Sequence, residues 1–478
     1  MDWIKDVKKA HIIGIGGIGV SAVARLLLAS GVEVSGSDFA ESGVVDVLRR
    51  VGAKVTIGHA AENLPADVDL VVRTSAVPDD NPELAEARRR KLRNLSYFEF
   101  LGEYARGKRT VAVAGTNGKS TTTAMLGLIM IEAGFDPTVI VGTKVPSFDG
   151  GNLRLGGSNL LIVEACEYQD HFLNFSPAAA IVTNVEEDHL DYFTDRQHIM
   201  DSFGQFLDQV RQDGLVVLNA NDSDGAGALS WSGRTVRFGS GDGVDYLIGQ
   251  VKLGDGLQTF HLMKGEQDLG EIELHVPGRF NVENAATAAV TALEFGAPFE
   301  SVRKALSEYA GIWRRFEIVG EPYGGPVVSD YGHHPTAVEG TIAAAREFYP
   351  DRKIVLVFQP HHRNRTRNLF DRFVRSFDGA DSVVLLEIYD VIGREEAEDA
   401  GISSRDLLEA VIEHDHSRGV ERQLKYAASL DEGFAAIHAV LAPGAVTLVL
   451  GAGDVDQLAR RLAGGGPDSD SQKTDKPS

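Results

Sequence analysis

Short apolar runs rich in Val and Ile alternate with longer amphipathic segments along most of the chain. The short runs are typical of buried strands in a parallel sheet, and the amphipathic segments are typical of helices that pack on one. A clear example is the run at 10–13, which is followed by a glycine-rich turn and a helical pattern that continues to Ser30. Strands are predicted at 10–13, 31–36, 54–57, 70–73, 110–113, 138–141, 159–163, 179–184, 326–329, 353–358, 382–386 and 446–450. The pattern predicts an α/β fold.

The chain has 478 residues, which is more than one hydrophobic core normally supports. We expect a Rossmann-like domain over 1–108, a central P-loop ATPase-type domain with a parallel sheet over 109–312, and a C-terminal Rossmann-like domain over 313–463. Within the central domain, the Gly- and Asp-punctuated segment 240–275 predicts a peripheral β-meander. The last segment, 464–478, contains no apolar residue that could be buried, so we expect it to be disordered.

Composition narrows the class of protein. Apolar residues make up 43% of the chain and charged residues 24%, as in ordinary soluble globular proteins. The formal charge of −22 argues against a nucleic-acid partner, because phosphate backbones need a basic face. No apolar run is long enough to span a bilayer, and the opening residues lack the layout of a signal peptide. The single cysteine, Cys166, fits a reducing compartment. We therefore expect a cytoplasmic protein without membrane insertion.

The segment RTVAVAGTNGKSTTT, residues 109–123, predicts a phosphate-binding loop between a buried strand and a helix. In such a loop, backbone N–H groups and the helix N-terminus attract phosphate oxygens. Lys119 would neutralise the β- and γ-phosphates of ATP, and the Ser120 hydroxyl would bind Mg²⁺. The loop is a shortened variant, because Val113 stands where the general P-loop pattern has glycine. The residues predicted to bind ATP here are Gly115, Thr116, Asn117, Gly118, Lys119, Ser120 and Thr121.

Carboxylate and imidazole groups follow two other predicted strands of the central domain. Glu164 comes directly after the strand at 159–163, and His189 follows the strand at 179–184. Because the ends of parallel strands meet at one edge of a sheet, both side chains are candidate Mg²⁺ ligands beside the phosphate loop. Farther along, Asn281 and Asn284 lie three residues apart on a predicted helix, where they could contact an adenine edge or cap a helix.

The first domain carries a second glycine motif. Gly14, Gly16 and Gly19 satisfy G-x-G-x-x-G between a strand and a helix, and Asp38 lies where an acidic residue can meet a ribose. Taken alone, this motif suggests an NAD-dependent oxidoreductase. The motif is only moderately specific, however, because any pyrophosphate can bind at that helix N-terminus. Ser75 follows another strand end of the same domain, which is where ligands bind in open α/β sheets.

Two phosphate loops together suggest that ATP acts on a nucleotide-linked substrate. A carboxylate reacts poorly with an amine at neutral pH, whereas an acyl phosphate carries a good leaving group. Lys119, Mg²⁺ and Arg315 would offset the charge that develops during phosphoryl transfer. Arg365, in the third domain, could hold the carboxylate of an amino acid and so present its amine.

Nine segments, in the family's order and spread from Ala10 to about Ala463, resemble the Mur ligase family. They are GIGGIGVSAVARLL (14–27), SGSD (35–38), VAVAGTNGKSTTT (111–123), TNVEEDHLDYF (183–193), PGRFNVENAATA (277–288), RRFE (314–317), SDYGHHPT (329–336), VFQPHHRNRTRNLFD (357–371) and GAGD (451–454). The resemblance is greatest to the branch that joins L-alanine to UDP-N-acetylmuramate. It implies an ATP- and Mg²⁺-dependent ligase of peptidoglycan precursor synthesis, expected as a monomer or homodimer.

The resemblance also implies residue roles. The UDP-sugar would be bound by Gly14, Gly16, Gly17, Gly19, Ser37, Asp38 and Ser75. Lys119, Glu164, His189 and Arg315 would be catalytic, and Ser120, Glu164 and His189 would hold Mg²⁺. Asn284 would meet the adenine, and Asp330 would contact the nucleotide from the third domain. The incoming amino acid would lie near Tyr331, His333 and Arg365.

Some residues depart from the family pattern. No lysine occurs between Lys144 and Lys252, so the carbamylated lysine of members that add later residues is absent, as in the alanine-adding and tripeptide-recycling branches. Cys166 replaces an aspartate, and His362 stands where some members have a second arginine. The ligase that attaches a recycled murein tripeptide to UDP-N-acetylmuramate is the alternative within the family. The segment QPHHRNRTR favours the L-alanine branch.

Overall fold

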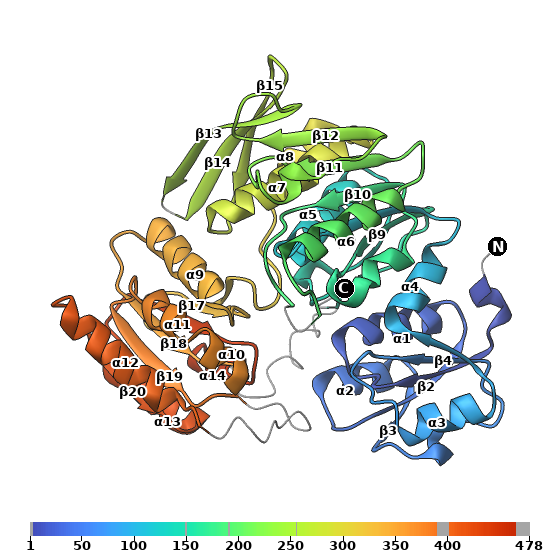
Figure 1. Cartoon of the computed structure of the whole chain (residues 1–478), viewed down its shortest axis with the longest axis horizontal. Coiled ribbons are helices and arrows are strands. Elements are labelled where there is room, and N and C mark those ends of the chain that lie inside the picture. Colours follow the sequence, from blue (N-terminus) through green and yellow to red (C-terminus); the bar gives the residue numbers. More distant parts are fainter. Residues whose placement is uncertain (1–2, 149–150, 190–191, 255, 390–400, 465–478) are drawn as a thin grey trace, which may run out of the picture. The chain divides into compact units, whose positions relative to one another are not determined.

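The computed structural model of the chain describes residues 3–148, 151–189, 192–254, 256–389 and 401–464. The chain divides into two compact units (elements in Figure 1). The first comprises Met1–Val251, Thr259–Glu273 and Phe280–Tyr309. The second comprises Lys252–Gln258, Leu274–Arg279 and Ala310–Ser478. The first unit contains both predicted phosphate loops, and the second contains the predicted amino-acid-binding residues.

The first sheet has five parallel strands in the order β3-β2-β1-β4-β5. They are β1 (Lys9–Ile13), β2 (Glu33–Asp38), β3 (Lys54–Ile57), β4 (Leu70–Arg73) and β5 (Arg93–Ser96). The helices between them are η1 (Trp3–Asp6), α1 (Ile18–Ala29), α2 (Gly43–Arg50), η2 (Ala61–Asn63), α3 (Pro82–Arg89) and α4 (Tyr97–Ala105).

Alternate residues of these strands enter two different cores. Ile12 belongs to the core that contains α1 and Phe100 of α4, whereas Ile13 packs with Leu84 of α3. This follows from the period of two along a strand, which sends neighbouring side chains to opposite faces of the sheet. The sheet is therefore covered on both faces, as a doubly wound fold requires.

The central sheet has ten strands in the order β15-β14-β13-β12-β11-β10-β6-β9-β7-β8. The strands are β6 (Arg109–Ala114), β7 (Thr138–Ile140), β8 (Leu153–Arg154), β9 (Leu160–Glu164), β10 (Ala179–Val182), β11 (Leu215–Asn219), β12 (Arg234–Gly239), β13 (Tyr246–Gly254), β14 (Leu257–Lys264) and β15 (Gln267–Leu274). The helices are α5 (Lys119–Glu132), η3 (Pro146–Phe148), η4 (Tyr168–Asn174), α6 (Arg196–Asp208), η5 (Ala226–Ala228), α7 (Arg279–Glu294) and α8 (Phe299–Ser307).

The expectation of a parallel central sheet needs correction at its edges. In the sheet order, the neighbouring strands from β13 through β12, β11, β10, β6 and β9 to β7 pair in parallel. At the edge, β8 pairs antiparallel with β7, so the sheet is mixed. β8 has only two residues and lies at the edge of the sheet, next to β7. The segment predicted as a peripheral β-meander supplies β13, β14 and β15, which extend the opposite edge of the sheet.

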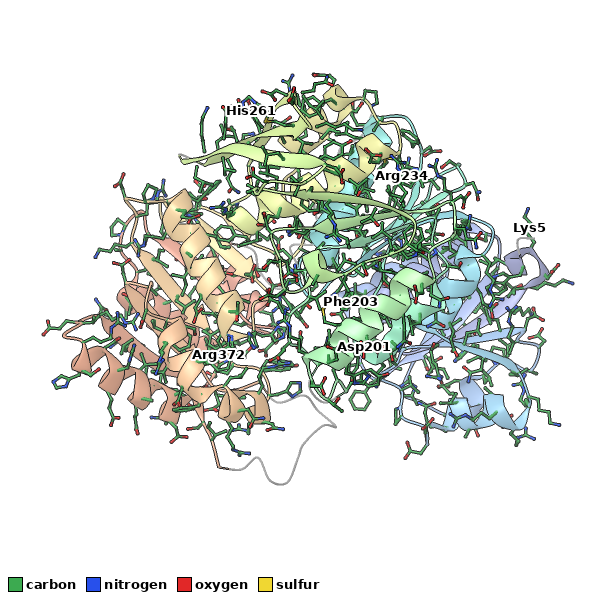
Figure 2. All side chains as sticks on the ribbon, turned by 45° about the horizontal axis from the view of Figure 1, so that its top comes forward. Lys5, Asp201, Phe203, Arg234, His261 and Arg372 are labelled. Atoms are coloured by element: carbon green, nitrogen blue, oxygen red, sulfur yellow. The ribbon has the colours of Figure 1, made fainter. Side chains whose placement is uncertain are left out.

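The first two sheets share one continuous core within the first unit. Phe100 of α4, Phe172 of η4 and Phe203 of α6 belong to the same cluster of buried side chains. On α6, Phe203 is buried and Asp201 is exposed, which is the amphipathic pattern of a helix that covers a core (Figure 2). A side chain at Gly102 would overlap the Asn174 carbonyl, so α4 approaches η4 closely.

The third sheet has six strands in the order β16-β17-β21-β18-β19-β20, with β16 antiparallel to β17 and the other pairings parallel. The strands are β16 (Glu317–Gly320), β17 (Val327–Asp330), β18 (Ile354–Phe358), β19 (Ser382–Leu386), β20 (Gln423–Ala427) and β21 (Val446–Leu450). The helices are α9 (Pro335–Phe348), α10 (Arg363–Asn368), α11 (Phe370–Ser376), α12 (Ser404–Ser417), α13 (Leu430–Val440) and α14 (Asp456–Leu462). Leu356 and Val357 of β18 enter opposite cores, so this sheet is also covered on both faces.

In the part of the chain that the structure describes, no helix has both the length and the apolar character needed to cross a bilayer. The tail predicted to be disordered lies, apart from Gly464, outside the described residues.

Candidate active site

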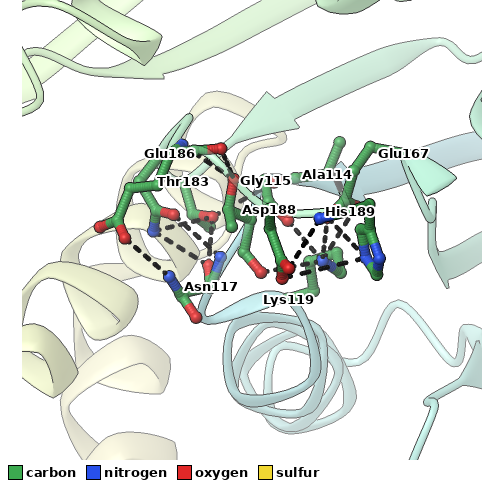
Figure 3. Close-up of polar contacts among 11 residues, drawn as sticks. Ala114, Gly115, Asn117, Lys119, Glu167, Thr183, Glu186, Asp188 and His189 are labelled. Carbon is green, nitrogen blue, oxygen red and sulfur yellow. Dashed lines mark hydrogen bonds and ion pairs between the residues drawn. The ribbon is translucent and has the colours of Figure 1, made fainter. Parts of the chain in front are cut away.

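The loop between β6 and α5 has the backbone shape of a phosphate cradle (Figure 3). Gly115 and Gly118 have φ angles of 132° and 83°, which L side chains rarely adopt. A Cβ atom at Gly115 would overlap the Thr183 hydroxyl, and one at Gly118 would overlap the Asn284 amide oxygen. Both positions therefore require glycine, and α5 begins immediately afterwards with its N-terminal N–H groups available to an anion.

The end of β10 holds this loop in place. The backbone N–H of Asn117 donates to the Asn184 amide oxygen at 2.8 Å, and the Thr183 hydroxyl donates to the Asn117 carbonyl at 2.6 Å. The backbone N–H of Glu186 donates to the Thr116 hydroxyl at 2.9 Å. These contacts fix the loop without a bound ligand, which lowers the ordering cost of ligand binding.

Lys119 folds back onto the loop. Its Nζ donates to the carbonyls of Gly115 at 2.5 Å and Thr116 at 3.1 Å, and to both carboxylate oxygens of Glu167 at 3.0 and 2.9 Å. The side chains of Lys119 and Glu167 are 18% and 3% exposed. Burial lowers the pKa of Lys119, but the Glu167 carboxylate outweighs it, so the pKa is raised and the lysine stays charged.

The candidate Mg²⁺ ligands lie around the same loop. Ser120 occupies the first turn of α5, and Thr121 is buried. Glu164 ends β9 and accepts a hydrogen bond from the Gly142 backbone N–H at 2.5 Å. His189 Nε2 lies 4.0 Å from Glu167 Oε1; Figure 3 shows both side chains beside Lys119. Among the described residues, no three His, Cys, Asp or Glu side chains gather as a metal site, so hydroxyl and phosphate oxygens would have to complete the shell.

Asn284 is buried against the cradle. Its Oδ1 accepts from the Thr122 hydroxyl at 3.3 Å, and its Nδ2 donates to the Asn281 amide oxygen at 3.2 Å. Neither contact is a cap, because both partners are side chains and not backbone N–H groups at a helix end. The contact with adenine stays a prediction.

The first glycine motif also forms a tight turn before a helix. Gly14 has a φ of 77°, and its N–H donates to the Ser37 carbonyl at 2.8 Å. The Gly16 N–H donates to Asp38 Oδ2 at 2.7 Å, and Gly17 caps α1. The ring of Tyr97 abuts Gly19, and Ser75 is exposed just beyond β4. The predicted UDP-sugar residues thus lie around the β1 and β4 ends and the start of α1.

Ser37 is the exception, because its hydroxyl points inward. It is fully buried and donates to Glu83 Oε2 at 2.5 Å. Glu83 is also buried and further contacts His11 at 3.3 Å and Asn63 at 2.7 Å. Burial opposes the charge on Glu83, but these hydrogen bonds lower its pKa to about 2. In this structure Ser37 supports the glycine turn through its carbonyl, and direct contact with a ligand stays a prediction.

In the second unit, the two arginines at 314 and 315 have different environments. Arg314 is buried and its guanidinium donates to the Gly451 carbonyl, and burial lowers its pKa. Arg315 is exposed, and its guanidinium lies 5.3 Å from the Tyr331 ring centre. Asp330 accepts from the backbone N–H groups of Phe316 and Gly332, both at 2.7 Å, while burial raises its pKa despite nearby Arg315. Of the two arginines, Arg315 is the one exposed for a ligand.

The predicted amino-acid residues gather around His361. The Tyr331 and His333 rings lie 5.4 Å apart, and His333 lies 6.2 Å from His361. Burial, together with His362, His333 and Arg365, lowers the pKa of His361 to about 3. Burial is the largest cause of this low pKa, and the nearby Arg365 and Arg314 add positive charge that suits a carboxylate ligand.

Three family models match successive parts of the chain. The model described as Mur ligase family, catalytic domain, matches residues 9–109. The Mur ligase middle domain matches residues 113–292, and the Mur ligase, glutamate ligase domain, matches residues 314–453. The chain belongs to the Mur ligase family.

Relatives in the Mur ligase family match over nearly the full chain. The UDP-N-acetylmuramate–L-alanine ligase of Salinibacter ruber is 41% identical over 94% of this chain and 93% of its own. That of Trichlorobacter lovleyi is 39% identical over 96% and 98%. The solved UDP-N-acetylmuramate–alanine ligase of Thermotoga maritima has a TM-score of 0.80 at 30% identity, covering 95% and 98%. A murein peptide ligase from Psychrobacter arcticus shares the fold, with a TM-score of 0.68 at 23% identity.

Sequence reasoning missed three residues that stand out in this Mur ligase. Glu167 pairs with Lys119, Glu83 accepts a hydrogen bond from Ser37 below the glycine turn, and the half-buried His361 lies near His333 and Arg365. Glu167 comes three residues after β9, which pairs with β6, the strand before the phosphate loop. This position was the signal that could have identified Glu167. No sequence signal marks Glu83, because its partners are 20 to 72 residues away.

Proposed function

We propose that this chain joins L-alanine to the carboxylate of UDP-N-acetylmuramate in the cytoplasm, coupled to conversion of ATP to ADP and phosphate. The observation that carries the proposal is the 41% identity, over 94% of the chain, to a relative named as a UDP-N-acetylmuramate–L-alanine ligase. An ATP-dependent Mur ligase also needs a second phosphate loop and a residue such as Arg315 at the γ-phosphate. An NAD-dependent oxidoreductase would need neither.

ATP would bind at the loop from Gly115 to Thr121. The absence of side chains at Gly115 and Gly118 lets the backbone approach the phosphates, and the start of α5 favours their negative charge. The charged Lys119 would turn from the loop carbonyls to the β- and γ-phosphates. Asn284 and Asp330 are proposed nucleotide contacts, and Arg315 would meet the γ-phosphate.

Mg²⁺ would supply charge neutralisation at the phosphates. The chemistry of the donors fits it, because Ser120, Glu164 and His189 offer two oxygen ligands and one nitrogen ligand around the cradle. The Gly142 N–H orients the Glu164 carboxylate at 2.5 Å, so the side chain is held in place without a metal.

UDP-N-acetylmuramate would bind the N-terminal turn. Gly14, Gly16, Gly17 and Gly19 place α1 so that its first N–H groups face the pyrophosphate. Asp38 accepts from the Gly16 N–H through Oδ2 at 2.7 Å and from the Ala40 N–H through Oδ1 at 3.5 Å, and its carboxylate would meet the ribose or sugar. Ser75 is exposed at the adjacent strand end.

L-Alanine would be captured in the C-terminal domain. Arg365, beside His333 and His361, would hold the amino-acid carboxylate and leave its amine free. His361 stays neutral at physiological pH because its pKa is lowered to about 3, so it would serve as a neutral hydrogen-bonding group beside the amino acid and not as the base that deprotonates it.

With ATP, UDP-N-acetylmuramate and L-alanine bound at these sites, the reaction would proceed in two steps. A carboxylate oxygen of the UDP-sugar attacks the γ-phosphorus of ATP, and the bond to ADP breaks. The amine of L-alanine then attacks the acyl carbon, phosphate leaves, and the amine loses a proton. Lys119 and Arg315 would stabilise the charge that accumulates on the transferred phosphoryl group.

The test is phosphate release by the purified protein with UDP-N-acetylmuramate, ATP and Mg²⁺, offered L-alanine, glycine, L-serine or the murein tripeptide in turn. We expect L-alanine to give the highest kcat/KM and the tripeptide to give none above background. A preference for the tripeptide would instead identify the protein as the ligase that attaches a recycled murein tripeptide to UDP-N-acetylmuramate. No release with any acceptor would reject both.

A further inference from the structure

The contact between Lys119 and Glu167 has a consequence for ATP binding. An ammonium group has three hydrogens, yet Lys119 Nζ lies within 3.1 Å of four oxygens, two of them carbonyls of the loop and two of them from Glu167. Every hydrogen of this lysine is therefore used inside the cradle that the phosphates must enter (Figure 3).

Glu167 is placed for this role by the fold. It follows β9, which pairs with β6, the strand that leads into the loop, with Val113 opposite Glu164. Its side chain is 3% exposed, so it reaches Lys119 from inside the protein rather than from solvent. His189 Nε2 also lies near this carboxylate, 4.0 Å from Oε1.

We propose that Glu167 is a positioning residue that holds Lys119 in the cradle and, through its negative charge, weakens the first encounter with ATP. The inference rests on the proposed ATP site. Two effects follow from one carboxylate. Its charge partly neutralises the lysine and repels the incoming phosphates, whereas its geometry fixes where Nζ lies when the phosphoryl group is transferred.

The two effects move ATP affinity and turnover in opposite directions. Glu167→Gln keeps the side-chain shape but removes the charge, so it should tighten ATP binding, on the order of 10-fold, because a charged hydrogen bond no longer competes. The same variant should lower kcat, on the order of 10-fold, because an amide holds the ammonium less firmly. A merely structural role for Glu167 would weaken binding and turnover together.

Glu167→Asp tests the effect of side-chain length separately from the effect of charge. The aspartate keeps the charge but is one methylene shorter, so ATP affinity should stay within about two-fold of wild type while kcat still falls. The matched control is Glu132→Gln at the other end of α5, where Glu132 pairs with Lys304 at 2.8 Å. It removes the same kind of charge pair from the same helix, about 20 Å away. It should change neither quantity.

The experiment is isothermal titration of each purified full-length variant with a non-hydrolysable ATP analogue and Mg²⁺, together with steady-state kcat. Thermal melting of each variant shows whether it is folded. Tighter binding with lower kcat in Glu167→Gln supports the proposal. Unchanged or weaker binding in a folded Glu167→Gln protein overturns it. If the wild-type protein binds no ATP analogue, the proposed ATP site itself fails.

Discussion

The buried carboxylate of Glu83 gives a prediction whose size follows from the structure. It is fully buried below the N-terminal glycine turn and accepts from Ser37 at 2.5 Å and Asn63 at 2.7 Å. These contacts, together with His11, lower its pKa from 4.5 to about 2. A difference of about 2.5 pKa units between unfolded and folded states corresponds to about 3 kcal/mol of stability.

The sign of the effect is set by the lowered pKa. A carboxylate whose folded pKa is depressed stabilises the protein above its unfolded pKa, and this contribution is lost as the pH falls toward the folded pKa. Between pH 5 and pH 3, Glu83 should therefore lose about 2 kcal/mol of its contribution. His11 and His59 are ionisable groups that face Glu83, at 3.3 and 3.6 Å from its carboxylate oxygens.

The assay compares wild type with Glu83→Gln, which cannot titrate. Unfolding is followed in denaturant through Trp3, which packs against Phe100 in the same domain, with Trp231 and Trp313 replaced by Phe in both proteins. The free-energy gap between the two proteins should narrow by about 2 kcal/mol from pH 5 to pH 3. The exposed Glu62 provides the control, since Glu62→Gln should give a gap near zero at both pH values.

A gap that stays constant from pH 5 to pH 3 would refute the reasoning, because it would mean that Glu83 is not held as a carboxylate in the folded state. A second readout joins stability to function. Ser37, which Glu83 holds, accepts the N–H groups of Gly14 and Ile15 through its carbonyl, so Glu83→Gln should also weaken binding of UDP-N-acetylmuramate. Unchanged affinity would show that the turn keeps its shape without Glu83.

Three further substitutions test the roles assigned to single residues. Lys119→Ala should lower kcat by about 100-fold or more while isothermal titration still detects UDP-N-acetylmuramate binding, and normal turnover would remove the loop lysine from the mechanism. Arg365→Ala should raise the KM for L-alanine by about 10-fold or more with little change in kcat, and an unaltered KM would assign the carboxylate to other groups. Gly118→Ala should abolish ATP-analogue binding, because its φ of 83° is strained for alanine by about 1–2 kcal/mol and the new Cβ overlaps Asn284. Retained ATP binding would show that the cradle can widen.

Local sequence patterns predicted the strands that carry the site. The run Thr110–Val113 lies within β6, and the strands expected at 70–73, 382–386 and 446–450 coincide with β4, β19 and β21. These strands are buried on both faces, so their sequences are continuously apolar and easy to detect. β5 and β20 escaped prediction, because they are edge strands with exposed or polar positions such as Arg93 and Gln423. β11 also escaped prediction although it is an interior strand with every residue buried, so the apolar pattern did not reveal all interior strands.

The candidate site was predictable where it depends on contiguous residues. The two glycine turns and Lys119 follow from motif spacing, since loop and helix adjoin along the chain. The partners of these groups come from distant segments: Glu167 lies 48 residues after Lys119, and Glu83 lies 46 residues after Ser37. The Ser37 hydroxyl points into the protein because the fold places the Glu83 carboxylate within hydrogen-bonding distance of it. One sequence without its structure does not contain that pairing in any local pattern.

Oxygen transfer from the sugar carboxylate tests the central claim most directly. UDP-N-acetylmuramate labelled with ¹⁸O in its carboxylate is incubated with the enzyme, ATP, Mg²⁺ and L-alanine, and the released phosphate is analysed by mass spectrometry. An acyl phosphate intermediate predicts one ¹⁸O atom in each phosphate, because the carboxylate oxygen that attacks phosphorus leaves with it. Product formation with unlabelled phosphate would contradict the account.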